Sequence, residues 1–279
     1  MDKIRQAVDL ARSATRIGSV VDEVHAQRIG SVVDEVTAPR LQSAQNPGFM
    51  RVKLDPKHLE ANRIVAHATT DARARAFDML RTQVLQSMEA ASWQFLAVTS
   101  PTAGCGKTVT AANLALSIAR QPERNVLLVD LDMRKPKVAE YLGFKFDRGI
   151  MSALDGRASL LETVVEASYG PYSLQVLPNE GCTVGTAEWM ASQSMNNLLQ
   201  AIRREFRSHV VIFDLPPMLV GDDVICFLPK VDSVLLIGGA GMSSVADITE
   251  CNKHLQTTNV LRFVLNKVTE SAGPHYGYY

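Results

Sequence analysis

The sequence predicts an α/β fold with a mostly parallel sheet and helices on both faces. Six short apolar runs have the length of strands and lie at residues 94–99, 126–130, 174–177, 209–214, 233–238 and 260–266. Helical stretches separate most of them, at 108–120, 190–206 and 243–256. Continuous Val/Ile/Leu runs that alternate with helices are typical of a parallel sheet buried on both faces.

The residues before the first apolar run divide into two parts. The nonapeptide Arg-Ile-Gly-Ser-Val-Val-Asp-Glu-Val occurs at 16–24 and again, unchanged, at 28–36, and the stretch 39–56 resembles a linker. We therefore interpret residues 1–70 as a largely flexible extension. From residue 71 the pattern is regular: Phe77, Leu80, Val84 and Met88 recur at helical spacing and predict an amphipathic helix.

The loop after the run at 94–99 carries the first chemical motif. Residues 100–108 read Ser-Pro-Thr-Ala-Gly-Cys-Gly-Lys-Thr and open the helical stretch that follows. In such a loop the backbone N–H groups bind phosphate, the lysine reaches the terminal phosphates and the threonine hydroxyl ligates Mg²⁺. This predicts a P-loop NTPase fold, although Pro101 replaces the usual first glycine. The candidate nucleotide contacts are Ala103, Gly104, Cys105, Gly106, Lys107, Thr108 and Val109.

Two further motifs place aspartates at the ends of predicted strands. The run at 126–130 ends in Asp130-Leu-Asp132-Met-Arg134, and the run at 209–214 ends in Asp214 followed by two prolines. Ligands of open α/β sheets bind at the carboxyl ends of the strands, so these carboxylates can meet at one edge. A single aspartate at a strand end can also be a turn or a helix cap. The candidate metal ligands are Thr108, Asp130, Asp132 and Asp214, and the candidate catalytic residues are Lys107 and the same three aspartates.

Together these motifs resemble those of the bacterial tyrosine kinases (BY-kinases) of capsule and exopolysaccharide assembly. The family's phosphate loop, DxDxR motif and DxPP motif stand here at 103–108, 127–134 and 211–217, and the chain ends in a tyrosine cluster. The resemblance covers roughly residues 71–279. It implies a P-loop kinase domain over 71–270 and a mobile tail over 271–279. The phosphoacceptors would be Tyr276, Tyr278 and Tyr279.

The resemblance also implies roles for individual residues. ATP and Mg²⁺ would be the cofactors, with Asp214 in the shell of the metal. Asp130 would orient or deprotonate the tyrosine hydroxyl while Asp132 completes the metal site, or the two would exchange roles. Arg134 would pair with a phosphate or with a carboxylate. Asn266 matches an asparagine that lies near the adenine in related P-loop proteins.

Self-assembly is a further implication of the resemblance. The family's first helix carries Glu-x-x-Arg-x-x-Arg-Thr, which serves ring assembly, and the register here gives Arg75, Asp78, Arg81 and Thr82. The first two charges are exchanged in sign. We expect a homo-oligomer, such as a ring, whose contacts include Arg75, Asp78 and Arg81.

Charge and hydropathy guide the expectations about partners. Lys plus Arg and Asp plus Glu number 29 each, so a broad field for binding nucleic acid is not indicated. The apolar runs are too short for a membrane span, which favours a cytoplasmic location. The family implies a separate transmembrane polysaccharide co-polymerase, a chain-length regulator, as activator. The chain would then lie peripherally at the inner face of the membrane, with a protein-tyrosine phosphatase as its opponent.

Two other functions remain open on the sequence. A positioning or partitioning ATPase of the related P-loop class carries a signature lysine near the start of the loop, where this chain has Thr102. A nucleotide-binding scaffold of polysaccharide assembly that lacks kinase activity is the other alternative.

Overall fold

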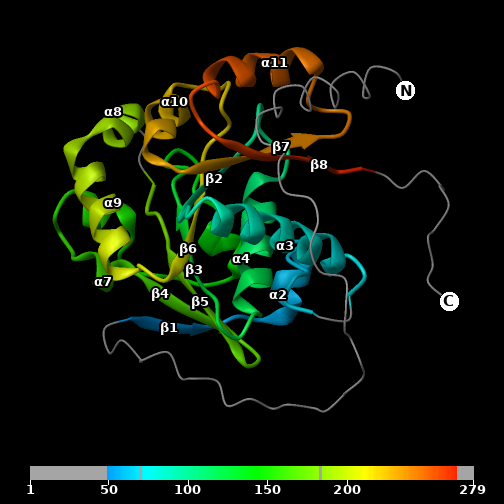
Figure 1. The fold of residues 1–279 in the computed structure, drawn as a ribbon. Coiled ribbons are helices and arrows are strands. Elements are labelled where there is room, and N and C mark those ends of the chain that lie inside the picture. Colours follow the sequence, from blue (N-terminus) through cyan, green and yellow to red (C-terminus); the bar gives the residue numbers. More distant parts are fainter. Residues whose placement is uncertain (1–48, 69–70, 182–183, 269–279) are drawn as a thin grey trace, which may run out of the picture. The chain divides into compact units, whose positions relative to one another are not determined.

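An eight-stranded sheet forms the centre of the fold (Figure 1). The computed structural model describes residues 49–68, 71–181 and 184–268. The strand order is β1-β4-β5-β3-β6-β2-β7-β8. Six strands are mutually parallel, while β1 and β4 run in the opposite direction because β4 pairs antiparallel with β5. The strands are β1 (Met50–Lys53), β2 (Phe95–Thr99), β3 (Asn125–Asp130), β4 (Val165–Tyr169), β5 (Tyr172–Leu177), β6 (His209–Asp214), β7 (Ser233–Gly239) and β8 (Val260–Asn266).

Helices cover both faces of the sheet, as predicted. One face packs against α2 (Pro56–Ala61), α3 (Ala74–Ala90), α4 (Lys107–Ala119) and α5 (Val138–Leu142). The other packs against α6 (Ile150–Leu154), α7 (Leu160–Thr163), α8 (Thr186–Ala191), α9 (Gln193–Glu205), α10 (Asp223–Phe227) and α11 (Val245–His254). A 3₁₀ turn, Leu228–Lys230, follows α10. Successive residues of β3 point to opposite cores: Val126 and Leu128 to one, Leu127 and Val129 to the other.

The predicted helix over 190–206 is two helices. Ser192, in extended conformation, separates α8 from α9, and its hydroxyl accepts a hydrogen bond from the Met195 N–H. Serine at this position satisfies an otherwise free N–H of the first helical turn. The sequence interpretation missed this cap.

The linker predicted over 39–56 is wrong from Met50 onward. Residues 50–53 form β1, which pairs in parallel with β4, and α2 begins at Pro56. The folded domain therefore starts well before residue 71. The tandem repeat at 16–36 and the tyrosine tail at 271–279 lie outside the described residues.

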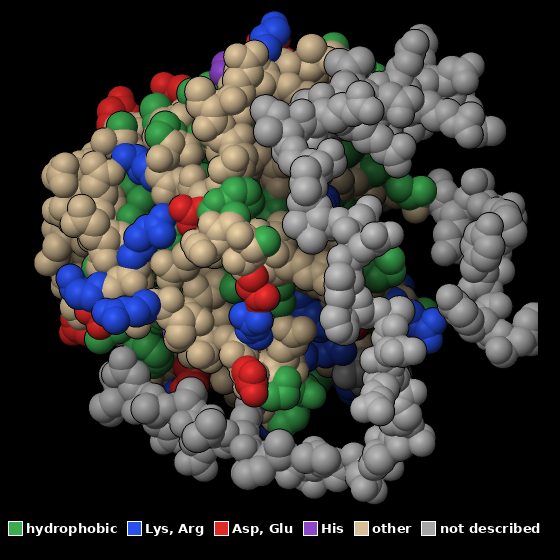
Figure 2. Space-filling model, in the orientation of Figure 1, with side chains coloured by type: hydrophobic (Ala, Val, Ile, Leu, Met, Phe, Trp, Pro, Cys, Tyr) green, Lys and Arg blue, Asp and Glu red, His purple; other side chains and the backbone are tan. Residues whose placement is uncertain are grey.

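The surface and the helices of the described part give two further facts. On the face seen in Figure 2, acidic and basic side chains are interspersed over the described residues. No helix within 49–68, 71–181 or 184–268 is long and apolar enough to cross a membrane.

Candidate nucleotide-binding site

The phosphate loop joins the buried strand β2 to α4. Gly104 and Gly106 have φ angles of +81° and +92°, a conformation that side chains disfavour. A Cβ atom at Gly106 would also lie 2.3 Å from the Asn266 side-chain nitrogen. The helix that follows is nearly all buried, which explains its alanine-rich sequence. The core therefore fixes α4, and its N-terminus is held at the loop.

Lys107 lies between two aspartates at the start of α4. Its Nζ is 2.8 Å from Asp132 Oδ2 and 3.7 Å from Asp214 Oδ1, so α4, the segment after β3 and the end of β6 meet at this ammonium. Burial acts to lower the pKa of Lys107, but the two carboxylates outweigh it and hold the pKa above its usual value. The lysine is therefore a cation at neutral pH.

Asp214 is fully buried, and neither of its carboxylate oxygens accepts a hydrogen bond from a described residue. Burial raises the pKa of Asp214, although Lys107 and the nearby Thr108 hydroxyl oppose the shift. A buried carboxylate without a hydrogen-bond donor is costly, and the Lys107 ammonium at 3.7 Å offsets that cost only in part, since the pKa of Asp214 stays raised. The side chain is thus suited to receive a metal ion.

The Asp130 carboxylate, unlike that of Asp214, accepts several backbone hydrogen bonds. Its Oδ2 accepts hydrogen bonds from the N–H groups of Lys137 and Val138, both at 3.0 Å, and its Oδ1 accepts one from the N–H of Asp132 at 3.2 Å. Burial and the charge of Asp214 raise the pKa of Asp130, against the Val138 N–H. This carboxylate holds the start of α5, the cap role that the sequence left open.

A magnesium site fits these residues. No cluster of three or more His, Cys, Asp or Glu side chains in the described ranges is placed to hold a metal ion. Mg²⁺, however, is usually bound by one or two carboxylates together with substrate phosphates and water. Asp214, whose oxygens accept no hydrogen bond from a described residue, and Asp132 and Thr108, both in contact with Lys107 Nζ, meet that requirement.

Arg134 is paired with a carboxylate, one of the two roles considered for it. Its Nη2 lies 3.2 Å from Asp223 Oδ2, and its Nε donates to the Thr186 hydroxyl at 3.2 Å. These contacts tie the segment after β3 to α8 and α10. Neither Thr186 nor Asp223 was a candidate from the sequence, since neither lies in a recognised motif.

Asn266 contacts the loop from the end of β8. Its Nδ2 donates to the Cys105 carbonyl oxygen at 2.9 Å. The next residue, Lys267, has a φ of +59° and donates its N–H to Asn266 Oδ1. Cys105 is buried, with its Sγ 3.4 Å from the Ser243 hydroxyl. Asn266 thus braces the phosphate loop; a contact with adenine stays a prediction.

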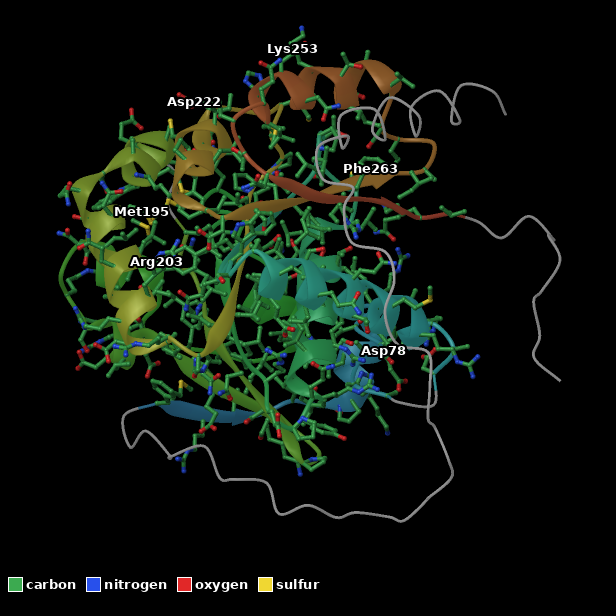
Figure 3. The ribbon with its side chains drawn as sticks, viewed as in Figure 1. Asp78, Met195, Arg203, Asp222, Lys253 and Phe263 are labelled. Carbon is green, nitrogen blue, oxygen red and sulfur yellow. The ribbon has the colours of Figure 1, made fainter. Side chains whose placement is uncertain are left out.

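Two of the three proposed assembly residues contact the protein's own α4. Asp78 on α3 (Figure 3) accepts hydrogen bonds from the Ser117 hydroxyl at 2.6 Å and from Arg81 and Arg120 at 3.1 Å. Arg81 also donates to the Ser117 carbonyl oxygen. Arg75 is exposed. The exchange of charges at 75 and 78 thus places the Asp78 carboxylate beside the Ser117 hydroxyl of α4 and beside Arg120, the residue that follows α4. Self-assembly stays a prediction.

Comparisons with known proteins identify the family of the chain. Residues 96–276 match the model of the CobQ/CobB/MinD/ParA nucleotide binding domain. The chain is 32% identical over 184 residues to the tyrosine-protein kinase YwqD of Bacillus subtilis, covering 65% of this chain and 76% of YwqD. EpsB of Ralstonia solanacearum, named among the tyrosine-protein kinases, is 31% identical over 209 residues, 75% of this chain.

The match to EpsB covers 27% of that protein, so this chain spans only about a quarter of it. Among solved structures, the VpsO kinase domain superposes with a TM-score of 0.60 at 27% identity, over 71% of this chain and 97% of that domain.

Proposed function

The chain belongs to the CobQ/CobB/MinD/ParA nucleotide-binding family and, within it, to the bacterial tyrosine-protein kinases, and on that premise we propose that it is an ATP-dependent protein-tyrosine autokinase. The observation that carries the proposal is Lys107 at the N-terminus of α4, held between Asp132 and the buried Asp214, whose oxygens accept no hydrogen bond from a described residue. Phosphoryl transfer relies mainly on positioning and on electrostatic stabilisation, and this arrangement offers both.

Each residue has a part in this proposal. The N–H groups of the phosphate loop and Lys107 would bind the β- and γ-phosphates of ATP. Thr108, Asp132 and Asp214 would hold Mg²⁺, which would neutralise charge on those phosphates. Asp130, whose carboxylate accepts hydrogen bonds from the start of α5, would lie at the side of the site where the acceptor tyrosine enters. Asn266 would stabilise the conformation of the phosphate loop. We assign Asp132 to the metal rather than Asp130 because Asp130 already accepts three backbone hydrogen bonds.

The acceptors and partners follow from the family resemblance. Tyr276, Tyr278 and Tyr279 would be phosphorylated in trans by another copy, within a homo-oligomer that Arg75 helps to form. A separate transmembrane polysaccharide co-polymerase would activate the kinase and hold it at the membrane. A protein-tyrosine phosphatase would reverse the reaction, and the cycle would regulate polymerisation and export of an exopolysaccharide or capsule.

One assay tests the proposal. The purified chain is incubated with Mg-ATP, with and without the cytosolic peptide of such a co-polymerase, and probed for phosphotyrosine. Wild type should become labelled, whereas Lys107→Met and the triple tail variant with Phe at 276, 278 and 279 should not. Lys253→Met serves as the matched control, since this exposed lysine on α11 pairs with Glu250.

The same assay separates the alternatives. ATP hydrolysis without phosphotyrosine in any condition would favour the positioning or partitioning ATPase. Nucleotide binding with neither reaction would favour the scaffold.

A further inference from the structure

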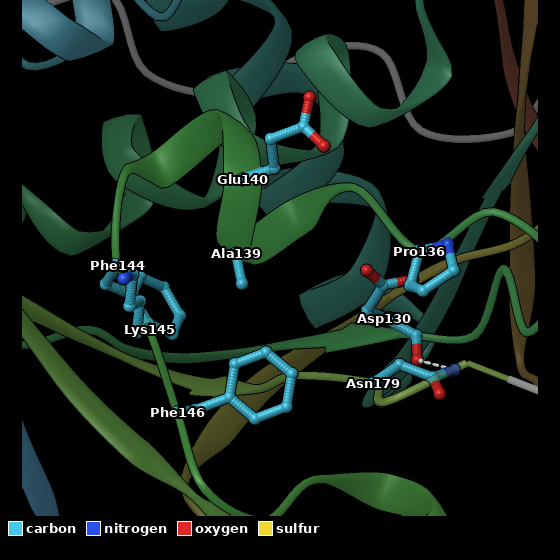
Figure 4. A pocket seen from close by; sticks show the side chains of 8 residues that line it. All are labelled: Asp130, Pro136, Ala139, Glu140, Phe144, Lys145, Phe146 and Asn179. Carbon is cyan, nitrogen blue, oxygen red and sulfur yellow. Dashed lines mark hydrogen bonds between the residues drawn. The ribbon is translucent and has the colours of Figure 1, made fainter.

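The last strand of the sheet, β8, has a free edge that lies apart from the cavity beside the nucleotide site. That cavity, of about 370 Å³, opens at the end of β3 and is lined by Asp130 and Asn179 among others (Figure 4), so it belongs to the site already described. β6, β2 and β7 lie between β3 and β8 in the sheet. Among the described strands, β8 pairs only with β7 (Figure 1). A strand at such an edge offers unpaired N–H and C=O groups to another extended chain.

Two residues of β8 turn their backbone groups away from the sheet. The Asn266 carbonyl oxygen accepts a hydrogen bond from the Ala240 N–H at 2.8 Å, so the backbone of Asn266 faces β7. Backbone groups alternate in direction along a strand, and the register with β7 is regular from Arg262 to Asn266. The N–H and C=O groups of Phe263 and Leu265 therefore point outward, and none of them has a hydrogen-bond partner among the described residues.

The side chains along this edge are open to a further strand. Val260 and Leu265 are each 43% exposed, although both are apolar. Proteins often block a free edge with a proline or a bulge, and Arg262–Asn266 contains neither. An added strand would therefore gain main-chain hydrogen bonds and cover exposed apolar side chains, which is how sheets recognise extended peptides.

The edge is also basic. Arg262 and Lys267 are both exposed and lie near the two ends of the regular pairing. Arg262 Nη1 donates to the Leu261 carbonyl oxygen at 2.8 Å, and Lys267 Nζ contacts Met242 Sδ at 3.5 Å. Within the described ranges no carboxylate forms an ion pair with either side chain. The edge is therefore complementary to an extended segment that carries negative charge.

One segment of this chain has that composition, and the kinase function does not account for it. The nonapeptide Arg-Ile-Gly-Ser-Val-Val-Asp-Glu-Val stands at 16–24 and again at 28–36, outside the described residues. Four of its nine residues are β-branched and none is proline, a composition that favours pairing as a strand. Its adjacent Asp and Glu supply negative charge, and nine residues are enough to pair along the seven of β8.

We propose that the free edge of β8 binds this nonapeptide from a second copy of the chain, as a strand added beside Phe263 and Leu265. In a parallel alignment its acidic pair would lie beside Lys267, and in an antiparallel one beside Arg262. Because the nonapeptide and the edge are different surfaces, the contact is head to tail and can continue from copy to copy. Two such segments in each chain raise the valency of that assembly. This contact goes beyond the proposed kinase function and requires no phosphoryl transfer.

Peptide binding to the full chain tests the edge without ATP. The parent protein for these titrations carries Val21→Asp and Val33→Asp, so that its own two segments no longer compete. A fluorescent peptide with the nonapeptide sequence is titrated with this parent, and the dissociation constant is read from anisotropy. Leu265→Pro removes an N–H that faces away from β7 and should weaken binding by about fivefold or more, the scale of one hydrogen bond. Leu265→Thr, the matched control, keeps that N–H and should bind nearly as tightly as the parent.

Charge reversal tests the same contact through its side chains. Arg262→Glu combined with Lys267→Glu should weaken peptide binding by about tenfold at low salt. A peptide with Lys in place of its Asp and Glu should bind this double variant more tightly than it binds the parent. The thermal midpoint shows whether Leu265→Pro unfolds, and in that case the charge reversal decides. The contact is overturned if the parent does not bind the peptide, or if the double variant binds it as tightly as the parent.

The mass of the full chain in solution tests whether the contact joins copies. Light scattering of wild type should show a mass that rises with protein concentration, whereas Leu265→Pro and the parent with both segments altered should show a smaller rise. Equal masses for wild type and these variants overturn docking between copies, even where the added peptide binds. Equal peptide affinity of folded Leu265→Pro and Leu265→Thr overturns the strand addition itself. Peptide binding without phosphotyrosine in the kinase assay would count against the kinase function alone.

Discussion

Lys107 and Asp132 form a 2.8 Å ion pair between the phosphate loop and the segment after β3, with both side chains almost fully buried. The lysine that would bind phosphate is thus already neutralised by a carboxylate of the protein. A nucleotide phosphate must compete with that carboxylate unless a cation accompanies it. The pair therefore couples nucleotide binding to Mg²⁺.

Asp132→Asn tests both the competition of this carboxylate with phosphate for Lys107 and its part in Mg²⁺ binding. Without Mg²⁺ the variant should bind ADP more tightly than wild type, by roughly five- to tenfold, because Lys107 loses a charged competitor. The gain in affinity on adding Mg²⁺ should shrink. Titration with a fluorescent ADP in EDTA and in Mg²⁺ measures both, with Asp155→Asn as a surface control. Equal ADP affinity of variant and wild type in EDTA would contradict the prediction.

Asp214 predicts a pH dependence of stability. Its pKa is raised in the folded state, so the folded state binds the proton more tightly than the unfolded state. The free energy of unfolding should then fall as pH rises from about 4, the pKa of an unperturbed aspartate, through the raised value. Asp214→Asn removes this loss and should stabilise the nucleotide-free protein at neutral pH by roughly 1–3 kcal/mol.

Urea unfolding of wild type and Asp214→Asn between pH 4 and 8 checks this sign. The two curves should converge toward acid and separate toward neutral pH. A variant that is less stable than wild type at pH 7 without ligand would show that Lys107 already compensates the buried charge. Mg-ADP should stabilise only wild type substantially.

The two roles considered for Asn266, support of the phosphate loop and contact with adenine, predict different effects on base specificity. If Asn266 acts only by its hydrogen bond to the Cys105 carbonyl oxygen, Asn266→Ala should weaken ATP and GTP binding alike, by about fivefold, the scale of one hydrogen bond. A residue that reads adenine would instead change the ratio of the two affinities. Measured dissociation constants for both nucleotides decide between the roles. Asn259→Ala is a control, since this asparagine bonds to the Asp232 carbonyl oxygen.

The buried strands could be predicted because their composition alone identifies them. β2, β3, β6 and β7 are covered on both faces, so nearly every residue in them is apolar. β1 could not be predicted in the same way. Three of its four residues are exposed at the edge of the sheet, and β4 alternates between buried and half-buried positions. The Tyr-Gly-Pro-Tyr turn after β4 was the available signal for its hairpin with β5.

The residues of the candidate site also divide into those that could be predicted from the sequence and those that could not. The residues of the phosphate loop and the aspartates at the ends of β3 and β6 could be selected from the sequence because each follows an apolar run. Their partners could not, since Asp223 and Thr186 lie more than fifty residues from Arg134 and only the fold brings them together.

The contact between α3 and α4 predicts that substitutions at Asp78 and at Arg75 affect stability differently. Asp78→Ala removes the acceptor of Ser117, Arg81 and Arg120 and should cost about 1–3 kcal/mol of unfolding free energy, since it leaves partly buried donors unsatisfied. Arg75→Glu should leave stability unchanged, because its side chain is exposed. If α3 also serves assembly, Arg75→Glu alone should shift the mass measured by light scattering. A stable, unchanged Asp78→Ala protein would contradict the internal role.

His209 predicts how the domain unfolds in acid. It begins β6, packs against the Phe206 ring and has a buried Nδ1 with no hydrogen-bond partner among the described residues. Burial lowers the pKa of His209 to about 4, below its usual value near 6.5, because the charged ring is poorly solvated there. The contribution of the neutral His209 to the free energy of unfolding is fully present above pH 6.5. It is lost as pH falls toward 4, by roughly 3 kcal/mol in all.

His209→Phe should abolish this part of the acid transition. The variant keeps an aromatic ring against Phe206 but cannot bind a proton, so its unfolding free energy should change less than that of wild type between pH 6.5 and 4. Urea unfolding across that range measures the difference, and an NMR titration of the wild-type imidazole locates the pKa directly. Parallel curves for the two proteins would mean that the carboxylates, rather than this histidine, govern unfolding in acid.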